Sequence, residues 1–461
     1  MSMLASIIQQ LRSILGPGGV LTAPEDLAVY AYDGTFADQR PDVVVLPTTT
    51  EQVSRVVALA AAERIPVVTR GMGSGLAAGS VPFGGGMALA TTRMNRILEI
   101  DAGNGAALVQ AGVVTADLQA RVEQIGLFYP PDPSSIRHST IGGNIACNAG
   151  GPRCLKYGVT GDYVLGLTVV LPDGRVLKTG GKPIKDVVGY DLTALFTGSE
   201  GTLGVITEAL LRLVPKPRFV RTALAEFPSL DDASRSVNAI LEAGIVPVAL
   251  ELMDETAIGC IEEAMRLGLP LDVEAMLILE TDGANAAAVL EEIETAARIC
   301  CETGARNVRV AGDEAERSAL WRARRSVSPS LARKAPNKLG EDITVPRTAI
   351  PEAVRRIKAI SANRGLPVVV FGHAGDGNLH PNILFDRRDP QQWATVETMV
   401  AEIFDVSLAL GGTLSGEHGV GALKRPYLEK ALGPLSIEIQ RRIKQVLDPL
   451  GIMNPGKVFA E

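Results

Sequence analysis

The chain has 461 residues, enough for two or three domains, and 46% of them are hydrophobic, which is ample for buried cores. The formal net charge is -7 and no basic block stands out, so nucleic acid is not expected as a partner. No apolar run approaches the roughly 20 residues of a membrane span, and the N-terminus lacks the basic start of a signal peptide. We therefore expect a cytoplasmic protein with at most peripheral association at the inner face of the membrane.

The N-terminal part of the chain predicts a β-α-β unit. A buried strand at residues 41–47 is followed by a helix at residues 51–64, which Thr50 caps, and by a second strand at residues 65–69. The unit ends in the glycine-rich loop from Arg70 to Leu76. Such a loop offers bare backbone N–H groups to an anion.

This loop does not match the dinucleotide fingerprint, because Leu76 and Ala78 stand where that spacing needs glycine. We expect a phosphate cradle of another kind, with a flexible turn as the alternative.

Two further stretches are rich in glycine and small residues. Residues 139–151 read S-T-I-G-G-N-I-A-C-N-A-G-G, and residues 196–204 read F-T-G-S-E-G-T-L-G before a strand at residues 205–213. This composition indicates close approach of the backbone to a ligand, although tight packing between loops would explain some of the glycines. Pro215 and Pro217 then mark the first domain boundary.

Beyond residue 217, strands alternate with helices. The expected strands span residues 219–227, 246–252, 275–280 and 341–345, and the expected helices span residues 230–243, 284–303, 313–334, 350–364 and 435–450. This pattern predicts an open α+β layer with helices on one face.

Three of the four histidines fall in two short windows. His373 and His380 flank the turn A-G-D-G-N between two strand-like runs, so a hairpin would bring their imidazoles together. Glu417, in the second window, could add an anionic ligand, and two histidines with one carboxylate are typical of a catalytic divalent-metal site. The alternative is that these residues only serve the turn. His138 stands apart and is expected to be a loop residue rather than a ligand.

These motifs together resemble one family. The segments at residues 70–75, 131–135, 141–144, 148–151 and 195–201 resemble the FAD-binding half of the vanillyl-alcohol-oxidase type flavoproteins. Those at residues 373–380, 415–419 and 454–457 resemble the C-terminal half of the D-2-hydroxyacid dehydrogenase branch, which contains the FAD-binding subunit of bacterial glycolate oxidase and D-lactate dehydrogenase.

The resemblance implies an α+β fold with three parts. The first is a two-subdomain FAD-binding domain of the vanillyl-alcohol-oxidase type at residues 1–216, with its core at residues 41–216. The second is a ferredoxin-like α+β domain at residues 217–435, which binds substrate and metal. The third is a C-terminal return to the FAD-binding domain at residues 436–461.

The resemblance also implies a set of residues that line FAD. They are Arg70, Gly71, Gly73, Ser74, Gly75, Leu76, Asp132, Ser139, Gly142, Gly143, Asn144, Gly201, Val205, Ile206 and Asn454. Covalent members of the superfamily carry a flavin-linking histidine in the first loop. This chain has none there, so FAD is expected to be non-covalent.

The implied activity is FAD-dependent oxidation of a small D-2-hydroxy acid, glycolate or D-lactate, to the 2-oxo acid. A divalent metal (Zn, Mn or Fe) would be held by His373, His380 and Glu417. The implied catalytic residues are Arg324 for the substrate carboxylate, with Arg322 and Arg325 as adjacent alternatives, His418 as the base and Asn382 for orientation. Three alternatives remain open: a D-2-hydroxyglutarate dehydrogenase, which the loose alignment of Lys338 weakens, a metal-dependent hydrolase without a redox role, and a catalytically silent binding or assembly subunit, which would not need the histidine cluster.

Reduced flavin must pass its electrons on. The five cysteines contain no C-x-x-C pair, which speaks against an iron–sulfur cluster in this chain. A quinone, an electron-transfer flavoprotein or a separate iron–sulfur subunit is therefore implied as the acceptor. Both a homo-oligomer and a hetero-oligomer stay open.

Overall fold

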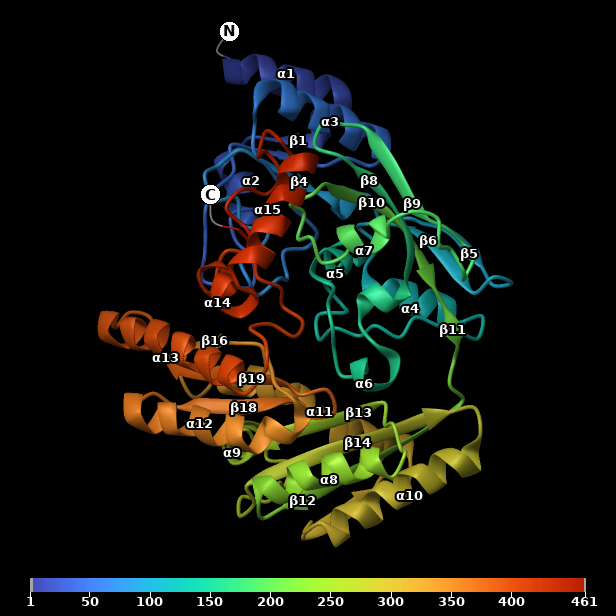
Figure 1. The fold of residues 1–461 in the computed structure, drawn as a ribbon, viewed down its shortest axis with the longest axis vertical. Coiled ribbons are helices and arrows are strands. Elements are labelled where there is room, and N and C mark those ends of the chain that lie inside the picture. Colours follow the sequence, from blue (N-terminus) through green and yellow to red (C-terminus); the bar gives the residue numbers. More distant parts are fainter. Residues whose placement is uncertain (1–2, 460–461) are drawn as a thin grey trace. The chain divides into compact units, whose positions relative to one another are not determined.

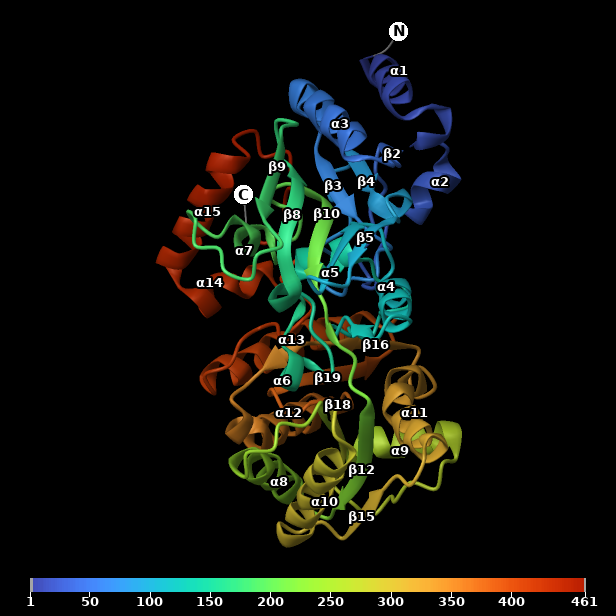
Figure 2. The same cartoon turned by 90° about the vertical axis from the view of Figure 1, so that its right-hand side faces the viewer.

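The computed structural model describes residues 3–459, which divide into two units (Figures 1 and 2). Unit 1 contains the residues up to Gly151, the range Gly158–Lys216, and the residues from Glu417 onward. Unit 2 contains Pro152–Tyr157 and Pro217–Gly416. The sequence between Pro217 and Gly416 is thus inserted into unit 1.

The first sheet of unit 1 has four strands in the order β1-β2-β4-β3. They are β1 (Val20–Leu21), β2 (Val43–Val45), β3 (Val67–Arg70) and β4 (Met87–Ala90). Strand β4 runs parallel to both β2 and β3, so the predicted β-α-β unit is confirmed. Its helix, α3 (Thr50–Glu63), is capped by Thr49, which accepts a hydrogen bond from Gln52 N, and not by Thr50 as predicted.

The core of this part is formed by apolar residues of α1 (Met3–Leu15), α3 and the first sheet. The C-terminal end of the chain completes it: Val67 N donates to Ile452 O, and Asn454 N donates to Val67 O, both at 2.8 Å. The residues around Met453 therefore lie beside β3 as an added extended segment. Helices α14 (Leu428–Leu432) and α15 (Pro434–Leu447) lead to it.

The second sheet of unit 1 is antiparallel, in the order β5-β6-β10-β8-β9. Its strands are β5 (Ile97–Asp101), β6 (Ala106–Gln110), β8 (Val164–Val170), β9 (Val176–Gly180) and β10 (Val205–Arg212). Helices α4 (Thr115–Glu123), α5 (Ile141–Cys147) and α7 (Leu192–Phe196) belong to the same part of the chain. A small pair, β7 (Leu127–Phe128) and β11 (Val214–Pro215), lies apart from this sheet.

Helix α5 forms within the second glycine-rich stretch of the sequence. Thr140 caps it by accepting a hydrogen bond from Gly143 N at 3.3 Å. Gly142 packs so closely that an added Cβ would lie 2.6 Å from Ala111 Cβ. Glycine is therefore required by packing at this position, and that packing outweighs its poor helix propensity.

Unit 2 is built on an antiparallel sheet in the order β15-β12-β14-β13-β18-β19-β16, with β17 paired to β19. The strands are β12 (Phe219–Phe227), β13 (Ala249–Asp254), β14 (Ala275–Gly283), β15 (Asn307–Val310), β16 (Asn337–Gly340), β17 (Ile343–Thr344), β18 (Val368–His373) and β19 (Asn378–Phe385). The helices are α6 (Cys154–Tyr157), α8 (Leu230–Glu242), α9 (Glu255–Met265), α10 (Ala286–Glu302), α11 (Glu314–Leu331), α12 (Ile350–Arg364) and α13 (Pro390–Ala409).

Helices cover both faces of this sheet, which corrects the prediction of helices on one face. Figure 2 shows α8 and α10 on one side of β12, and α9 and α11 on the other. Leu224, Met253, Ile278 and Phe371 point to the side of α9 and α11, where they share a core with Ile258. No helix among the described residues combines the length and the apolar character that crossing a bilayer requires.

Candidate active site

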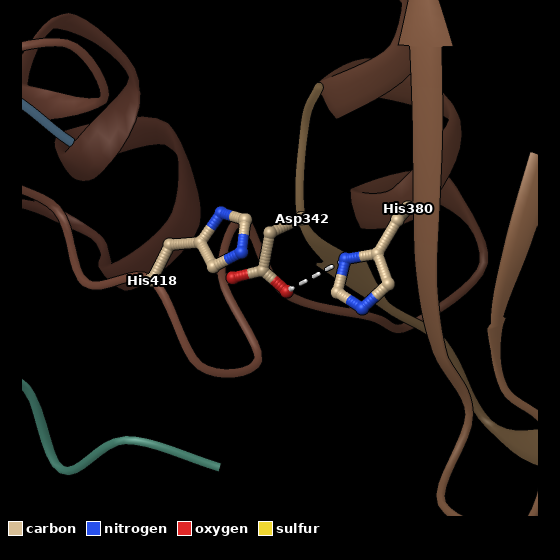
Figure 3. Close-up of side chains that lie close together, drawn as sticks. All are labelled: Asp342, His380 and His418. Carbon is tan, nitrogen blue, oxygen red and sulfur yellow. Dashed lines mark ion pairs between the residues drawn. The ribbon is translucent and has the colours of Figure 1, made fainter. Parts of the chain in front are cut away.

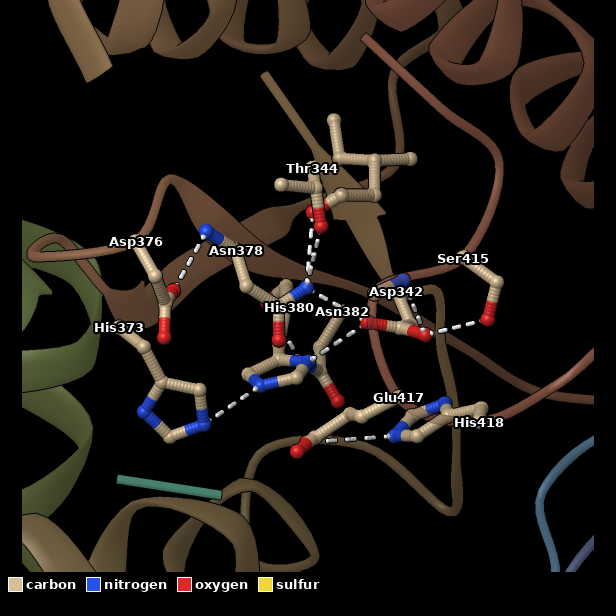
Figure 4. Close-up of polar contacts among 12 residues, drawn as sticks. Asp342, Thr344, His373, Asp376, Asn378, His380, Asn382, Ser415, Glu417 and His418 are labelled. Atoms are coloured by element: carbon tan, nitrogen blue, oxygen red, sulfur yellow. Dashed lines mark hydrogen bonds and ion pairs between the residues drawn. The ribbon is translucent and has the colours of Figure 1, made fainter. Parts of the chain in front are cut away.

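The hairpin that carries two of the histidines is confirmed. Strands β18 and β19 pair antiparallel, with His373 opposite Asn378, and the turn between them includes Gly377 at a φ of +85°. Both imidazoles are buried, and their Nε2 atoms lie 3.4 Å apart (Figure 4). Two imidazole nitrogens that bind one zinc ion at about 2.0–2.1 Å lie roughly 3.3 Å apart in tetrahedral geometry. The histidine pair therefore fits a shared cation.

A buried carboxylate orients the first of these histidines. Glu251 comes from β13, is fully buried, and its Oε1 lies 2.6 Å from His373 Nδ1. This contact holds Nδ1 as the protonated nitrogen and leaves Nε2 available as a ligand. Burial by itself would raise the pKa of Glu251, but the charges of His373 and Arg324 outweigh that effect and hold the pKa below its usual value.

The same carboxylate binds an arginine through its other oxygen. Arg324 Nη2 lies 2.7 Å from Glu251 Oε2, and its guanidinium stacks over the Phe371 ring, 4.8 Å from the centroid. Its Nε is buried and makes no hydrogen bond within the described residues. Arg322 and Arg325, which the sequence left as alternatives, are exposed on α11. Of the three, Arg324 is thus the one fixed beside the histidines.

A second buried carboxylate, Asp342, fixes the other side of the hairpin (Figures 3 and 4). Its Oδ1 accepts a hydrogen bond from Asn378 Nδ2 at 2.6 Å and lies 4.0 Å from His380 Nδ1. Its Oδ2 accepts from Ser415 Oγ at 2.7 Å and from Gly416 N at 3.0 Å. Asp342 therefore ties β19 to the chain segment that ends unit 2.

The remaining predicted catalytic residues lie close to these groups in sequence or on the same strand. Asn382 is buried on β19, and its Nδ2 donates to His380 O at 2.8 Å. Glu417 and His418 directly follow Gly416, and their side chains approach to 3.9 Å between Oε1 and Nε2 (Figure 4). The backbone bends at residues 416–418, which allows the two neighbouring side chains to approach each other.

In unit 1, the first glycine-rich loop has the properties of an anion cradle. None of the backbone N–H groups from Met72 to Leu76 donates a hydrogen bond to another described group. Buried polar atoms without a hydrogen-bond partner surround the loop. They are Asp33 Oδ2, Thr69 Oγ1, Arg70 Nε and Ser80 Oγ. Buried polar atoms are rarely left unsatisfied, so this part of unit 1 is built to receive a polar ligand.

Some residues of this loop also serve the chain's own packing. An added Cβ on Gly71 would lie 2.3 Å from Thr140 Oγ1, and on Gly73 it would lie 2.0 Å from Arg70 Nη2. Arg70 Nη1 donates to Tyr30 O and Tyr32 O, both at 3.0 Å. The Arg70 guanidinium is therefore engaged by the chain itself, and the N–H groups from Met72 to Leu76 take no part in these contacts.

The other predicted FAD residues gather on neighbouring segments of unit 1. Ser139 and Asn144 share contacts with Thr115: Ser139 Oγ lies 3.2 Å and Asn144 Nδ2 lies 2.7 Å from Thr115 Oγ1. Asp132 is half-buried, and its loop approaches Gly151 so closely that an added Cβ there would lie 2.4 Å from Asp132 O. His138 is an exposed loop residue, as predicted.

The third glycine-rich stretch meets the C-terminal return. Asn454 Nδ2 donates to Glu200 O at 2.7 Å and to Gly79 O at 3.0 Å, and Gly201 lies beside it at a φ of +70°. Val205 and Ile206 are buried at the start of β10, where the Val205 side chain belongs to the core of the first sheet.

Two carboxylates in unit 2 were missed by the sequence analysis. Glu251 is a lone acidic residue in the apolar run A-L-E-L-M, and an unpaired charge is not expected in a buried strand. That signal could have identified it. Asp342 carries no comparable signal, because it stands next to Glu341 before a short strand.

Two family models match the chain. Residues 41–180 match an FAD binding domain, and residues 216–458 match the C-terminal domain of FAD linked oxidases. The glycolate oxidase subunit GlcD of Bacillus subtilis (strain 168) is 46% identical over 454 residues, covering 98% of this chain and 96% of that protein. A D-lactate dehydrogenase of Anaerostipes hadrus is 36% identical, covering 98% and 97%.

Solved structures show the same fold. The structure of p-cresol methylhydroxylase with substrate bound superposes with a TM-score of 0.81 at 18% identity, covering 98% of this chain and 96% of that one. The fold is thus α+β with an FAD-binding part of the vanillyl-alcohol-oxidase type, as predicted. Fold and site together define a flavin-dependent oxidoreductase.

The chain belongs to the FAD-linked oxidase family that includes glycolate oxidase subunit GlcD and D-lactate dehydrogenase. Its cofactor is FAD, which the unsatisfied polar atoms around the first loop fit. Family membership argues against the alternative of a hydrolase without a redox role.

Proposed function

We propose that the protein oxidises a small D-2-hydroxy acid, glycolate or D-lactate, to the corresponding 2-oxo acid. The names of its relatives support this substrate class. One observation carries the proposal. The buried Glu251 carboxylate contacts both His373, one of the two histidines that could share a metal ion, and Arg324. A 2-hydroxy acid offers a hydroxyl and a carboxylate on adjacent atoms, and this group offers a receptor for each.

In this proposal Arg324 binds the substrate carboxylate. Its Nη2 is committed to Glu251, while its buried Nε has no hydrogen-bond partner within the described residues and is free to donate. A planar guanidinium binds a carboxylate through paired hydrogen bonds more specifically than an ammonium does.

His373, His380 and Glu417 would hold a divalent cation of zinc, manganese or iron, since each offers one ligand atom. The spacing of the two histidines fits such an ion. Glu417 is bonded to Gly416, whose N–H is fixed on Asp342 beside His380. The ion, when bound, would lower the pKa of the substrate hydroxyl.

His418 would remove the hydroxyl proton, which is work suited to an imidazole near neutral pH. Asn382 would orient the substrate from its place on β19. Bound FAD would accept the hydride from the substrate carbon. We propose that FAD is held without a covalent bond, by the residues that the sequence analysis assigns to it, because the first loop offers no histidine to link it.

Electrons would leave the reduced flavin for a separate acceptor. The five cysteines contain no C-x-x-C pair, and the related GlcD chains are named as subunits. We therefore propose a quinone, an electron-transfer flavoprotein or an iron–sulfur subunit as the partner, in a homo- or hetero-oligomer located in the cytoplasm or at the inner face of the membrane.

An anaerobic visible spectrum tests the proposal. Purified holoprotein would be mixed with glycolate, D-lactate or D-2-hydroxyglutarate, with and without prior chelation. We expect glycolate or D-lactate to bleach the flavin bands, and chelation to prevent it. Bleaching by D-2-hydroxyglutarate alone would favour the alternative substrate, for which Lys338, now bonded to the Ser328 hydroxyl, would be the second carboxylate receptor. A spectrum indifferent to all three acids would refute the substrate class.

A further inference from the structure

The dipeptide Glu417–His418 lies between two fixed points of the chain. On its N-terminal side, Gly416 N is bonded to Asp342 in unit 2. On its C-terminal side, in unit 1, Val420 N donates to Glu200 Oε1 and Gly421 N donates to Glu200 Oε2, each at 2.7 Å. The dipeptide belongs to no helix or strand, and these contacts hold the backbone on either side of it.

Glu200 is itself held rigidly. It lies in the third glycine-rich stretch at a φ of +51°, its N–H donates to Ala146 O at 2.8 Å, and its carbonyl accepts from Asn454 Nδ2. Burial raises the pKa of the Glu200 carboxyl, and the two N–H donors oppose that effect. Hydrogen bonds from N–H groups to a carboxylate are stronger than those between neutral groups.

The glycines after the dipeptide are explained by this contact. Gly419 has a φ of +85°, and an added Cβ would lie 3.0 Å from Glu200 Oε1. Gly421 has a φ of +52°, and an added Cβ would lie 1.9 Å from Ala77 O, which also accepts hydrogen bonds from Ala422 N and Leu423 N. Because Gly419 and Gly421 lack side chains, this segment can pack closely against Glu200 and against Ala77, which follows the first loop.

We propose that Glu200 is a positioning residue: by binding the N–H groups of Val420 and Gly421, it fixes Glu417 and His418 relative to the FAD-binding loops of unit 1. In this role it would act through the backbone of the segment rather than on the reacting atoms. Its effect on turnover rests on the proposed function, whereas the anchoring of the segment does not.

The test compares Glu200→Gln with a matched control, Glu208→Gln. Glu208 is a half-buried glutamate in β10 of the same unit, and its Oε2 accepts from Thr168 Oγ1 at 3.2 Å without touching the segment. Both variants would be studied as holoproteins by hydrogen exchange and by steady-state kinetics. Glu200→Asp, which keeps the charge but has a shorter reach, serves as a second variant if the amide impairs folding, and we expect it to rescue turnover in part.

In Glu200→Gln we expect exchange at Val420 and Gly421 to accelerate on the order of 10- to 100-fold, as one charge-assisted acceptor is lost. We expect kcat to fall about 10-fold or more through misplacement of His418, with KM and FAD affinity close to wild type. The control should change none of these quantities.

Unchanged hydrogen exchange at Val420 and Gly421 in both Glu200 variants would show that Glu200 does not anchor the segment. Faster exchange with unchanged kcat would overturn the positioning role, and loss of FAD from Glu200→Gln would assign Glu200 to the cofactor site instead. Wild-type protein that oxidises none of the three acids would refute the proposed function alone, because the exchange data still confirm or overturn the anchor.

Discussion

The bridging carboxylate Glu251 allows the sharpest test of the site, through the substitution Glu251→Gln. The side chain is fully buried and joins His373 at 2.6 Å to Arg324 at 2.7 Å. Glutamine keeps the volume but removes the charge, so the Arg324 guanidinium, with only 11% of its side chain exposed, is left without compensation. Breaking a buried pair in this way costs about 3–5 kcal/mol. Because glutamine keeps one acceptor, we expect a loss of about 3 kcal/mol in the free energy of unfolding.

The same substitution should weaken metal binding. Glutamine does not hold His373 Nδ1–H as a carboxylate does, and loss of such a partner to a metal-ligating histidine typically lowers metal affinity about 10- to 100-fold. Urea unfolding of the holoprotein measures the stability, and competition with a chromophoric chelator measures the affinity for zinc or manganese.

Glu226→Gln is the matched control on the same sheet. Glu226 pairs with Arg306 at 3.3 Å near the surface, and a pair of this kind contributes about 1 kcal/mol or less. A Glu251→Gln protein as stable as this control would refute the buried-pair argument. Reduced stability with unchanged metal affinity would show that Glu251 does not orient a metal ligand.

Three further predictions address individual residues. His418→Ala should retain FAD and metal but lose turnover by about 10²- to 10⁴-fold, the usual contribution of a general base. Arg324→Lys should raise KM for the hydroxy acid about 10-fold or more, because an ammonium cannot form paired hydrogen bonds, whereas the exposed Arg322→Lys should not. Burial lowers the pKa of Lys457 from 10.5 to about 8, so between pH 8 and 10.5 the unfolded chain holds more protons than the folded one. Wild type should therefore gain stability relative to Lys457→Met as the pH rises through that window, by about 3 kcal/mol in total.

Each of these predictions has a contradicting result. Near-normal turnover in His418→Ala would remove that residue from the base role. Equal effects of the Arg324 and Arg322 substitutions would mean that the carboxylate binds elsewhere. A stability difference between wild type and Lys457→Met that does not change from pH 8 to 10.5 would mean that Lys457 titrates normally in the folded protein.

The sequence predicted those parts of the molecule that depend on local signals. The hairpin of His373 and His380 could be predicted because its turn residues and both strands lie within a short stretch. The same holds for the β-α-β unit and the loop that ends it. Helix α13 carries such a signal as well, since Asp389 stands before Pro390 at its start, yet it was not predicted.

Other features depend on partners far away in the sequence. Glu251 becomes part of the site only because β13 pairs with β18 and brings it against His373. Helix α5 forms through two consecutive glycines because of its packing against Ala111, which no propensity reveals. The contact of Glu200 with Val420 joins a glycine-rich stretch to a segment more than 200 residues later, and no local pattern predicts it.

The course of the chain through the two units also sets the order in which the units are completed during biosynthesis. Unit 2 is complete once Gly416 has left the ribosome, whereas unit 1 still lacks the segment that lies beside β3 at Val67. The inserted unit can therefore fold first, although it comes second along the chain, since domains fold as units during synthesis. Asn454, which is made after the whole of unit 2, then binds the backbone of Gly79 and Glu200. Until residues 452–454 have been synthesised, the nascent protein has an unfinished cofactor domain, and a chain that stops before residue 452 should fold in part and remain colourless.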